Sequence, residues 1–306
     1  MTAAHGDAPT RLTPDVAAGA VLHQRLARQV AELHRGEHQI RSDDVHEGVH
    51  GARIACRRLR SALATFRPAL DRKLTDPLRE ELRWLGGVLG EVRDPHVAHE
   101  RLVGLLATEP AEEVAGPVRR RLDTTYAARL VSGEEQLTGV LDSPRHLALL
   151  DHLDELVADP PWTPAAGRPA GEVLPRRVRR DWKRLHGRMA AVTGASDQDV
   201  ALHDVRKAAK RLRYAAETLR PAWGDPAREL ADASRRLTDH LGERQDLLLV
   251  RADLTAMADA AEAAGEPSRT WGALLAREDA RRRELDAALV ATWRSVARGR
   301  LRRWLR

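Results

Sequence analysis

Apolar residues recur along most of this chain every three or four positions, which is the spacing of one face of an α-helix, while strand-like alternation is scarce. The pattern predicts an all-α fold. Proline, glycine and short polar clusters interrupt the period and set the expected helix ends. The predicted helices cover residues 14–35, 44–67, 72–92, 95–107, 111–131, 144–158, 172–193, 197–219, 225–242, 246–264, 267–277 and 279–305, with a shorter helical piece near 134–141.

The strongest interruption is the segment 159–171, which holds four prolines and two glycines. Such a composition is typical of a connection between folded parts. Each side of it has room for about four main helices joined by short connections, as in helical bundles. We therefore expect four parts: a flexible N-terminus at 1–13, a first bundle half at 14–158, a linker at 159–171 and a second bundle half at 172–306.

A basic string occurs twice in the chain. One copy runs from His50 to Arg60 and the other from His203 to Arg213, and their matching positions are offset by 153 residues. A second motif, Leu-Gly-Glu-x-x-Asp, follows at 89–94 and again at 241–246, with an offset of 152. Two motifs in the same order and at nearly the same spacing predict duplicated, pseudo-symmetric halves.

On a helix, each basic string separates into two faces. Arg53, Arg57 and Arg60 fall within an arc of roughly 80° that ends at His50. No carboxylate lies between them on this arc, although like charges three or four positions apart repel. The second basic face consists of His203, Arg206, Lys210 and Arg213, bordered by Lys207 and Tyr214, while Arg58 and Arg211 lie farther round the flanks. The opposite, apolar faces consist of Ala55, Cys56, Leu59, Ala62, Leu63 and Phe66 in the first copy, and Val205, Ala208, Ala209, Leu212, Ala215 and Leu219 in the second.

Unmixed positive charge indicates a ligand with many negative charges. Guanidinium groups suit phosphate because they offer a planar fork of donors, whereas a lysine acts as a point charge. A histidine at the edge of the arc can donate to phosphate and gain charge as the anion approaches. The alternatives are a solvated helix face and, for each histidine, a packing or capping role. An aspartate six residues before each histidine, Asp44 or Asp197, is placed to cap the helix.

Composition narrows the partner and the location. The net charge is +6 and the isoelectric point is about 10.1, which favours nucleic acid, an acidic membrane surface or a phosphate-rich polymer. Cys56 is the single cysteine, so an internal disulfide and a cysteine metal cluster are excluded, and it should lie on the buried side of its helix. We see neither a membrane-spanning apolar run nor a signal peptide, and expect a cytoplasmic location.

The doubled His-x-x-Arg-x-x-x-[Arg/Lys]-Arg-Leu-Arg pattern resembles the signature of the CHAD family, the conserved histidine α-helical domain. The Lys-Arg-Leu-Arg-Tyr string at 210–214 and both Leu-Gly-Glu-x-x-Asp segments are also similar, and the resemblance extends from about residue 14 to the end. It implies two pseudo-symmetric four-helix bundles around a central basic groove. It also implies non-catalytic binding of inorganic polyphosphate and association with polyphosphate granules. Many family members sit beside a β-barrel triphosphate-tunnel domain, and without such a strand-rich segment we expect a stand-alone module.

The resemblance assigns polyphosphate binding to the matching positions, and nearby positions are possible additional contacts. Two positions depart from the pattern: Ile54 stands opposite Lys207, which weakens the first basic face, and Gln245 in the second copy stands opposite Arg93, which counts against a phosphate role for Arg93. The expected polyphosphate-binding residues are His50, Arg53, Arg57, Arg58, Arg60, His203, Arg206, Lys207, Lys210, Arg211 and Arg213. The possible additional contacts are Arg93, Arg180, Lys183 and Tyr214, of which Arg180 and Lys183 should project alongside His203.

The second motif and the tail have structural interpretations. Asp94-Pro95 and Asp246 indicate helix starts, and Glu91 and Glu243 are placed to brace arginines of the basic helices. The basic tail 298–306 predicts a helix end packed through Trp304, with a polyanion or membrane-surface contact as the alternative.

Other chemistry has weaker support. The histidine pairs at 46/50 and 96/99 lack an accompanying metal-type carboxylate motif, and neither a glycine-rich phosphate loop nor a nucleophile elbow is visible. We therefore expect no catalytic residue, metal or cofactor. Two alternative functions stay open: binding of nucleic-acid phosphates, which the 3% aromatic content disfavours for base stacking, and a metal-dependent phosphohydrolase.

Overall fold

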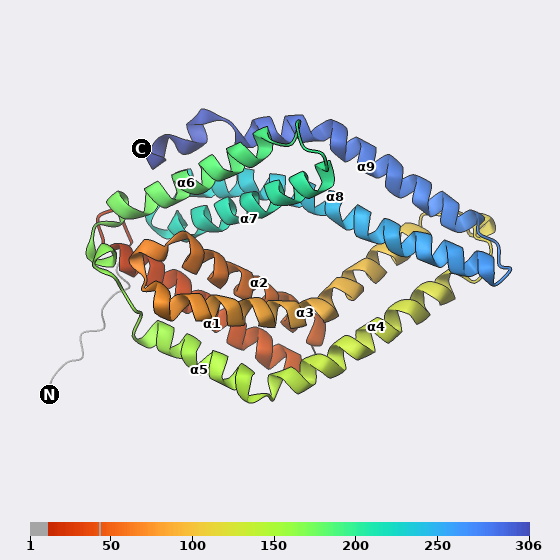
Figure 1. The fold of residues 1–306 in the computed structure, drawn as a ribbon, viewed down its shortest axis with the longest axis horizontal. Helices are drawn as coiled ribbons and strands as arrows, with labels where there is room; N and C mark the ends of the chain where they lie inside the picture. Colours follow the sequence, from red (N-terminus) through yellow and green to blue (C-terminus); the bar gives the residue numbers. More distant parts are fainter. Residues whose placement is uncertain (1–11, 43) are drawn as a thin grey trace.

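The computed structural model describes residues 12–42 and 44–306, and over these residues regular structure is helical apart from two isolated β-bridges. The all-α prediction is confirmed (Figure 1). Residues 1–11 of the segment 1–13, which we expected to be flexible, lie outside the described residues. The α-helices of the described chain are α1 (Ala18–Arg41), α2 (Val45–Thr65), α3 (Arg72–Leu106), α4 (Val118–Leu141), α5 (Pro144–Ala158), α6 (Ala170–Ala190), α7 (Gln198–Trp223), α8 (Asp225–Ala263) and α9 (Arg269–Val296). Short 3-10 turns are η1 (Arg67–Ala69), η2 (Ala111–Glu113), η3 (Pro164–Gly167) and η4 (Gly299–Leu305).

Several predicted helix breaks are wrong. The helix α3, which contains Pro77 and Pro95, continues through the predicted break at 93–94. The helix α8 continues through the predicted break at 243–245, and α9 through the one at 278. A proline inside a helix removes one backbone hydrogen bond, but tertiary packing can outweigh that loss. Val92 and Leu102, on either side of Pro95, are both fully buried. The predicted starts at Asp94 and Asp246 are therefore positions inside long helices.

The fourth helix shows why a glycine need not end a helix. Gly133 lies inside α4, where the sequence pattern predicted a gap between two helical pieces. A Cβ atom added to Gly133 would lie 2.7 Å from the carbonyl oxygen of Glu91 on α3. Only glycine permits so close an approach of two helix backbones. The residue is there for packing, and α4 remains unbroken.

Both predicted apolar faces are buried. Residues of the first face, such as Leu59 and Leu63, are fully enclosed among α1, α2 and α3, and Leu212 and Leu219 of the second are enclosed among α6, α7 and α8. Cys56 is buried as expected, and burial raises the pKa of its thiol to about 12. These faces hold α2 and α7 in the interior, and the two helices pack against each other.

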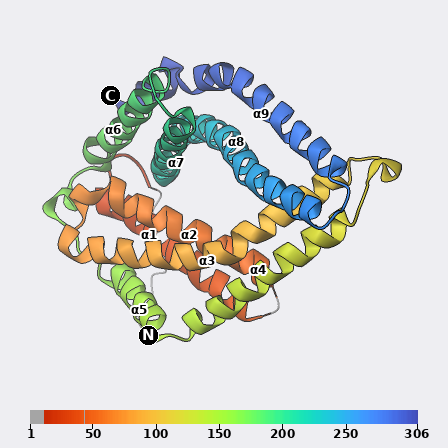
Figure 2. The same cartoon turned by 45° about the vertical axis from the view of Figure 1, so that its right-hand side comes forward.

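The long helices meet again at the opposite end of the molecule. From the body that contains α2 and α7, α3 and α4 extend along one side and α8 and α9 along the other, and the four converge at a tip (Figures 1 and 2). A separate apolar cluster joins them there, including Leu102, Tyr126, Leu254 and Trp271. Tyr126 on α4 also donates a hydrogen bond to Asp253 on α8 at 2.5 Å. The tip therefore links helices from the early and the late parts of the chain.

The segment 159–171 packs against the apolar cluster around α2 and also against the one around α7. Trp162 contacts two apolar clusters, Ala166 is buried, and the Thr163 amide donates to the Ala69 carbonyl at 3.1 Å. No helix in the described part of the chain combines the length and hydrophobicity that crossing a bilayer requires.

Candidate functional site: a basic cluster between two helices

The basic helices begin at the positions that the sequence indicates. Asp197 caps α7, because its carboxylate accepts hydrogen bonds from the amides of Asp199 at 2.9 Å and Val200 at 3.0 Å. Asp44 stands at the N-cap of α2 but its side chain makes no capping bond. The capping prediction is confirmed for Asp197 and wrong for Asp44.

Arg53 reaches from α2 across to α3. Its guanidinium donates to both carboxylate oxygens of Asp94, with Nη2 to Oδ2 at 3.0 Å. It also lies over Gly90, where an added Cβ would be 3.4 Å from Nη2. The Leu-Gly-Glu-x-x-Asp motif therefore provides a space and a carboxylate for the first arginine of the basic string. This role replaces the predicted helix cap at Asp94.

Arg206 has the matching position between α7 and α8. A Cβ at Gly242 would lie 3.3 Å from Nη2 of Arg206. Asp246 is near the same guanidinium, and Arg206, Arg101 and Lys210 all favour its charged form. Burial nevertheless raises the pKa of Asp246, with a smaller contribution from the charge of Asp94. The two motif aspartates are thus close enough to influence each other.

Lys210 is where the two basic strings meet. Burial lowers the pKa of Lys210 to about 8, and the charges of Arg206, Arg57 and Arg53 lower it further against the opposing effect of Asp246. Two of these arginines belong to α2 and one to α7. We call Arg53, Arg57, Arg206 and Lys210 the basic cluster. Its members come from both strings and act on the same lysine, so the two strings contribute to one cluster of positive charge.

Two arginines of the basic cluster carry unsatisfied donors. The Nε atoms of Arg57 and Arg206 are buried and have no hydrogen-bond partner within the described residues. Buried donors without partners are rare in folded proteins and call for an explanation such as an ion or ligand. An anion bound at the cluster would supply the missing acceptors.

The two histidines differ in their surroundings. His50 is half-buried, and burial, then Arg93, Arg57 and Arg53, lower its pKa against the effect of Glu47. His203 is exposed, and it is one of the neighbours that lower the pKa of Asp204. His50 and Arg93 therefore lie beside the basic cluster, whereas His203 stands nearer to solvent.

Other predicted contacts are held in ion pairs around Glu217 of α7. Arg58 lies 3.4 Å and Arg25 3.3 Å from its carboxylate, and Arg213 donates to it at 2.8 Å. Burial raises the pKa of Glu217, but these arginines outweigh burial and hold it below its ordinary value. Glu217 therefore links α1, α2 and α7 through Arg25, Arg58 and Arg213, and these arginines share its carboxylate.

The remaining predicted contacts are dispersed. Arg211 pairs with buried Asp181 on α6 at 2.7 Å and donates to the Ala64 carbonyl at 3.1 Å. Lys207 is exposed and pairs with Asp204 at 2.6 Å. The other predicted residues lie apart from these pairs: Tyr214 is buried, Arg60 lies near Arg79, Glu80 and Arg83, Arg180 is exposed, and Lys183 lines a cavity beside η4.

The bracing role expected for the motif glutamates is wrong for Glu243. Its carboxylate accepts from Arg281 on α9 at 2.6 Å, so it does not brace an arginine of the basic helices. The aspartates three residues later contact or adjoin those arginines instead. The signal was present in the sequence, because the motif repeats its glycine and aspartate together with the arginines.

Histidine pairing also differs from the sequence spacing. His46 stacks on His96, with ring centroids 3.9 Å apart, and His99 is hydrogen-bonded to Asp123 at 2.8 Å. Over residues 12–42 and 44–306, no three histidine, cysteine or acidic side chains gather in an arrangement that could hold a metal ion.

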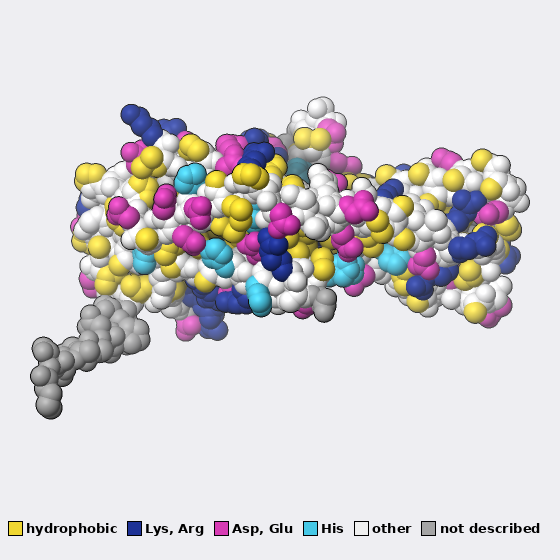
Figure 3. Space-filling model, turned by 90° about the horizontal axis from the view of Figure 1, so that it is seen from below, with side chains coloured by type: hydrophobic (Ala, Val, Ile, Leu, Met, Phe, Trp, Pro, Cys, Tyr) yellow, Lys and Arg dark blue, Asp and Glu magenta, His cyan; other side chains and the backbone are white. Residues whose placement is uncertain are grey.

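The surface charge elsewhere is mixed. The face in Figure 3 intermixes acidic, basic and histidine side chains, as expected for a solvated surface. Against this background, the basic cluster stands out as a place where positive charge gathers between helices. The molecule is thus an all-α protein in which four cationic side chains of α2 and α7 lie near one another, beside Asp94 and Asp246.

The CHAD domain family matches residues 24–255 of the chain, and the chain belongs to this family. It is 32% identical over 289 residues to the uncharacterized protein Rv2226 of Mycobacterium tuberculosis, a match that covers 91% of this chain and 54% of that protein. The uncharacterized protein MT2285 of a second M. tuberculosis strain gives the same identity and coverage. The chain therefore spans about half the length of these curated relatives.

Solved structures support the fold. The CHAD domain from the plant Ricinus communis is similar with a TM-score of 0.71 at 25% identity, covering 94% of this chain and 97% of that one. PptA from Streptomyces chartreusis also has a TM-score of 0.71, at 22% identity, covering 91% of this chain and 99% of that chain. The expected membership of the CHAD family is confirmed.

Proposed function

We propose that this protein binds inorganic polyphosphate without catalysis, through the basic cluster, and associates with polyphosphate granules. The observation that carries the proposal is the position of Lys210, surrounded by Arg206 of its own helix and by Arg53 and Arg57 of α2. A polymer with one negative charge on each phosphate offsets this repulsion. Arginine forks and a lysine point charge are suited to such a ligand.

The uncompensated charges give the proposal its specificity. Within the described residues, ion pairs of the two strings involve Arg53, Arg58, Lys207, Arg211 and Arg213. Arg57, Arg60, Arg206 and Lys210 are outside these pairs. Arg60 lies apart from the basic cluster beside Glu80, and Asp246 acts on Arg206 and Lys210 without an ion pair. Arg57, Arg206 and Lys210 are therefore the cluster cations that we expect to engage phosphate. We expect them to provide most of the affinity, with Arg53 shared between Asp94 and the ligand and with His50 and Arg93 at the margin.

We further propose that the protein consists of two pseudo-symmetric halves that share one groove at the cluster. A reciprocal contact supports this arrangement. Arg58 of α2 pairs with Glu217 of α7, and Arg211 of α7 donates to the carbonyl of Ala64 of α2. Arg211 is 153 residues after Arg58, and Glu217 is 153 residues after Ala64. Reciprocal contacts of this kind arise at an interface related by a two-fold axis.

A double charge reversal tests the proposed function. Arg57→Glu with Lys210→Glu changes two cluster cations that are outside the ion pairs described above. Each phosphate contact that is lost weakens binding and lowers its salt dependence. We expect long-chain polyphosphate to bind at least about tenfold more weakly, with a log–log salt slope smaller by about two. Calorimetric titration at several salt concentrations measures both quantities.

A matched variant controls for net charge. Arg120→Glu with Arg269→Glu makes the same change in charge at exposed positions of α4 and α9 near the distal tip. It should bind polyphosphate within about twofold of the unmodified protein, because screening weakens distant surface charges. Equal affinity of the cluster variant and this control would overturn the proposed function.

A further inference from the structure

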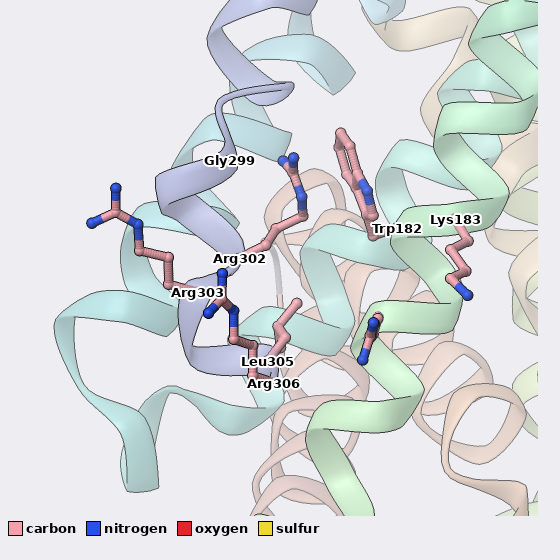
Figure 4. A pocket seen from close by; sticks show the side chains of 8 residues that line it. Trp182, Lys183, Gly299, Arg302, Arg303, Leu305 and Arg306 are labelled. Carbon is pink, nitrogen blue, oxygen red and sulfur yellow. The ribbon is translucent and has the colours of Figure 1, made fainter.

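A second cationic cavity lies between α6 and η4, away from the basic cluster. Its volume is about 320 Å³, and it shares no lining residue with the cluster. Figure 4 shows it from close by, with Trp182 on the side of α6 towards the turn that carries Arg302 and Arg306, and with Lys183 on the same helix. The complete lining is Arg179, Trp182, Lys183, Gly299, Arg302, Arg303, Leu305 and Arg306.

The lining is cationic without an acidic side chain. It contains four arginines and one lysine, and none of them takes part in the side-chain ion pairs of the described chain. Many arginines elsewhere on the surface are paired with a carboxylate, as Arg168 is with Glu172 at 2.7 Å. Like charges held in one small cavity repel unless an anion lies among them. The charge pattern therefore selects a negatively charged ligand.

Arg302 fixes one wall of the cavity. Its guanidinium lies 3.7 Å from the ring centroid of Trp182 and donates to three carbonyl oxygens at the end of α9. The donor-to-acceptor distances are 3.2 Å to Val296, 3.1 Å to Ala297 and 3.1 Å to Arg298. Leu301 and Leu305 of η4 are buried in the core beneath. The turn is thus anchored, and Arg302 acts as a positioning residue.

The aromatic side chain argues against a nucleotide. Trp182 stacks with Trp293, with ring centroids 5.6 Å apart and an interplanar angle of 5°, and also lies under Arg302. Its ring is therefore already engaged and is not offered to a base, although aromatic stacking is the usual way to hold one. What remains available is a set of phosphate donors on Arg179, Lys183 and Arg306.

We propose that this cavity is a separate binding site for a short inorganic oligophosphate. Arg179 and Lys183, four residues apart on α6, form one wall, and Arg306 on the other side completes the set of phosphate donors. The volume is at the lower end of the ~300–1,000 Å³ typical of small-molecule pockets. The inference does not rest on polyphosphate binding at the basic cluster, because the two sites have different residues.

Inorganic tripolyphosphate is the probe, and calorimetric titration is the measurement. We expect Arg179→Glu with Lys183→Glu to lose one class of binding sites, weakened by about tenfold or more. The cluster variant Arg57→Glu with Lys210→Glu should retain that class. The substituted α6 side chains are exposed, and a thermal melt followed by circular dichroism shows that the variant is folded. The control is again Arg120→Glu with Arg269→Glu.

The outcomes separate this site from the basic cluster. If the α6 variant titrates like the control, the cavity proposal is wrong whatever happens at the cluster. If only the cluster variant titrates like the control, the proposed function fails while the cavity proposal stands. A parallel arm uses phosphatidylcholine vesicles with and without phosphatidylserine. If the α6 variant loses binding to acidic vesicles but keeps tripolyphosphate binding, the site serves a lipid surface and the oligophosphate proposal is overturned.

Discussion

Gly242 on α8 lies directly against the guanidinium of Arg206 on α7, where a Cβ atom would come within 3.3 Å of Nη2. Gly90 on α3 has the same relation to Arg53 on α2 at 3.4 Å. In both cases the glycine of the second repeated motif provides the surface on which the first arginine of the basic string lies. The two motifs are therefore parts of one structural unit.

A bulky residue at Gly242 should displace Arg206 from the basic cluster. We expect Gly242→Leu to weaken polyphosphate binding by about three- to tenfold, because an arginine moved out of position loses phosphate hydrogen bonds. The measurement is a polyphosphate titration, with a thermal melt to show that the variant folds. The control is Gly104→Leu on α3, where an added Cβ meets no atom within 4 Å. If both variants bind alike, Gly242 does not position the arginine.

Removing the charge of Lys210 should stabilise the protein while weakening its binding. Lys210 is partly buried among Arg206, Arg57 and Arg53, and keeping it charged there costs free energy. We expect Lys210→Met to raise the free energy of unfolding by roughly 1–3 kcal/mol and to weaken polyphosphate binding. Denaturant unfolding and calorimetry measure the two effects. A loss of stability in this variant would show that Lys210 has a structural role.

Polyphosphate affinity should fall as the pH rises above about 8. The folded-state pKa of Lys210 is lowered to about 8, so in the free protein this charge is half lost at about pH 8 and mostly lost about one pH unit higher. A polyanion favours the protonated form, and binding in this range therefore takes up a proton. Titration at pH 7, 8 and 9 in buffers of different ionisation enthalpy detects the uptake. Lys210→Arg stays charged and should bind with little pH dependence over this window.

Glu217 should matter for stability rather than for binding. Its carboxylate pairs with Arg25, Arg58 and Arg213, and the side chains of Arg25 and Glu217 are only 9% and 19% exposed. Glu217→Gln leaves these arginines uncompensated, so we expect it to lower the free energy of unfolding by about 2–3 kcal/mol. The control is Glu172→Gln, which breaks an exposed pair with Arg168. It should change the free energy of unfolding by less than about 0.5 kcal/mol. Urea unfolding of the two variants compares them directly.

Duplex DNA should compete poorly with polyphosphate. The basic cluster concentrates its cations between two helices, where a flexible phosphate chain can follow them more readily than a stiff duplex. At equal phosphate concentration, we expect DNA to displace less than half of a bound labelled polyphosphate. A competition assay at physiological salt measures this. Complete displacement by DNA would favour the nucleic-acid alternative over the proposed function.

Much of the fold could be predicted from the helical periodicity and the repeated basic strings. The apolar faces that include Leu59 and Leu212 could be assigned because a period of 3.6 residues sorts side chains by direction without knowledge of the neighbours. The family could be recognised from the doubled signature for the same local reason. The breaks at Asp94 and Asp246 were mispredicted, because a proline and polar residues suggest a helix end whose outcome depends on tertiary packing.

Which basic residues are available to a ligand depended on contacts between distant segments. By helical position, Arg57 and Arg58 are neighbours with the same charge, yet Arg58 pairs with Glu217, which is 159 residues away, while Arg57 takes part in no ion pair of the described residues. The cavity beside η4 likewise joins Arg179 to Arg306, at opposite ends of the second half of the chain. The sequence by itself determined the helices, their apolar faces and the excess of positive charge, because these follow from local periodicity and composition. Only the tertiary structure decided which charges are neutralised and which remain exposed to an anion, because ion pairing depends on distances of a few ångströms between residues that the chain order does not relate.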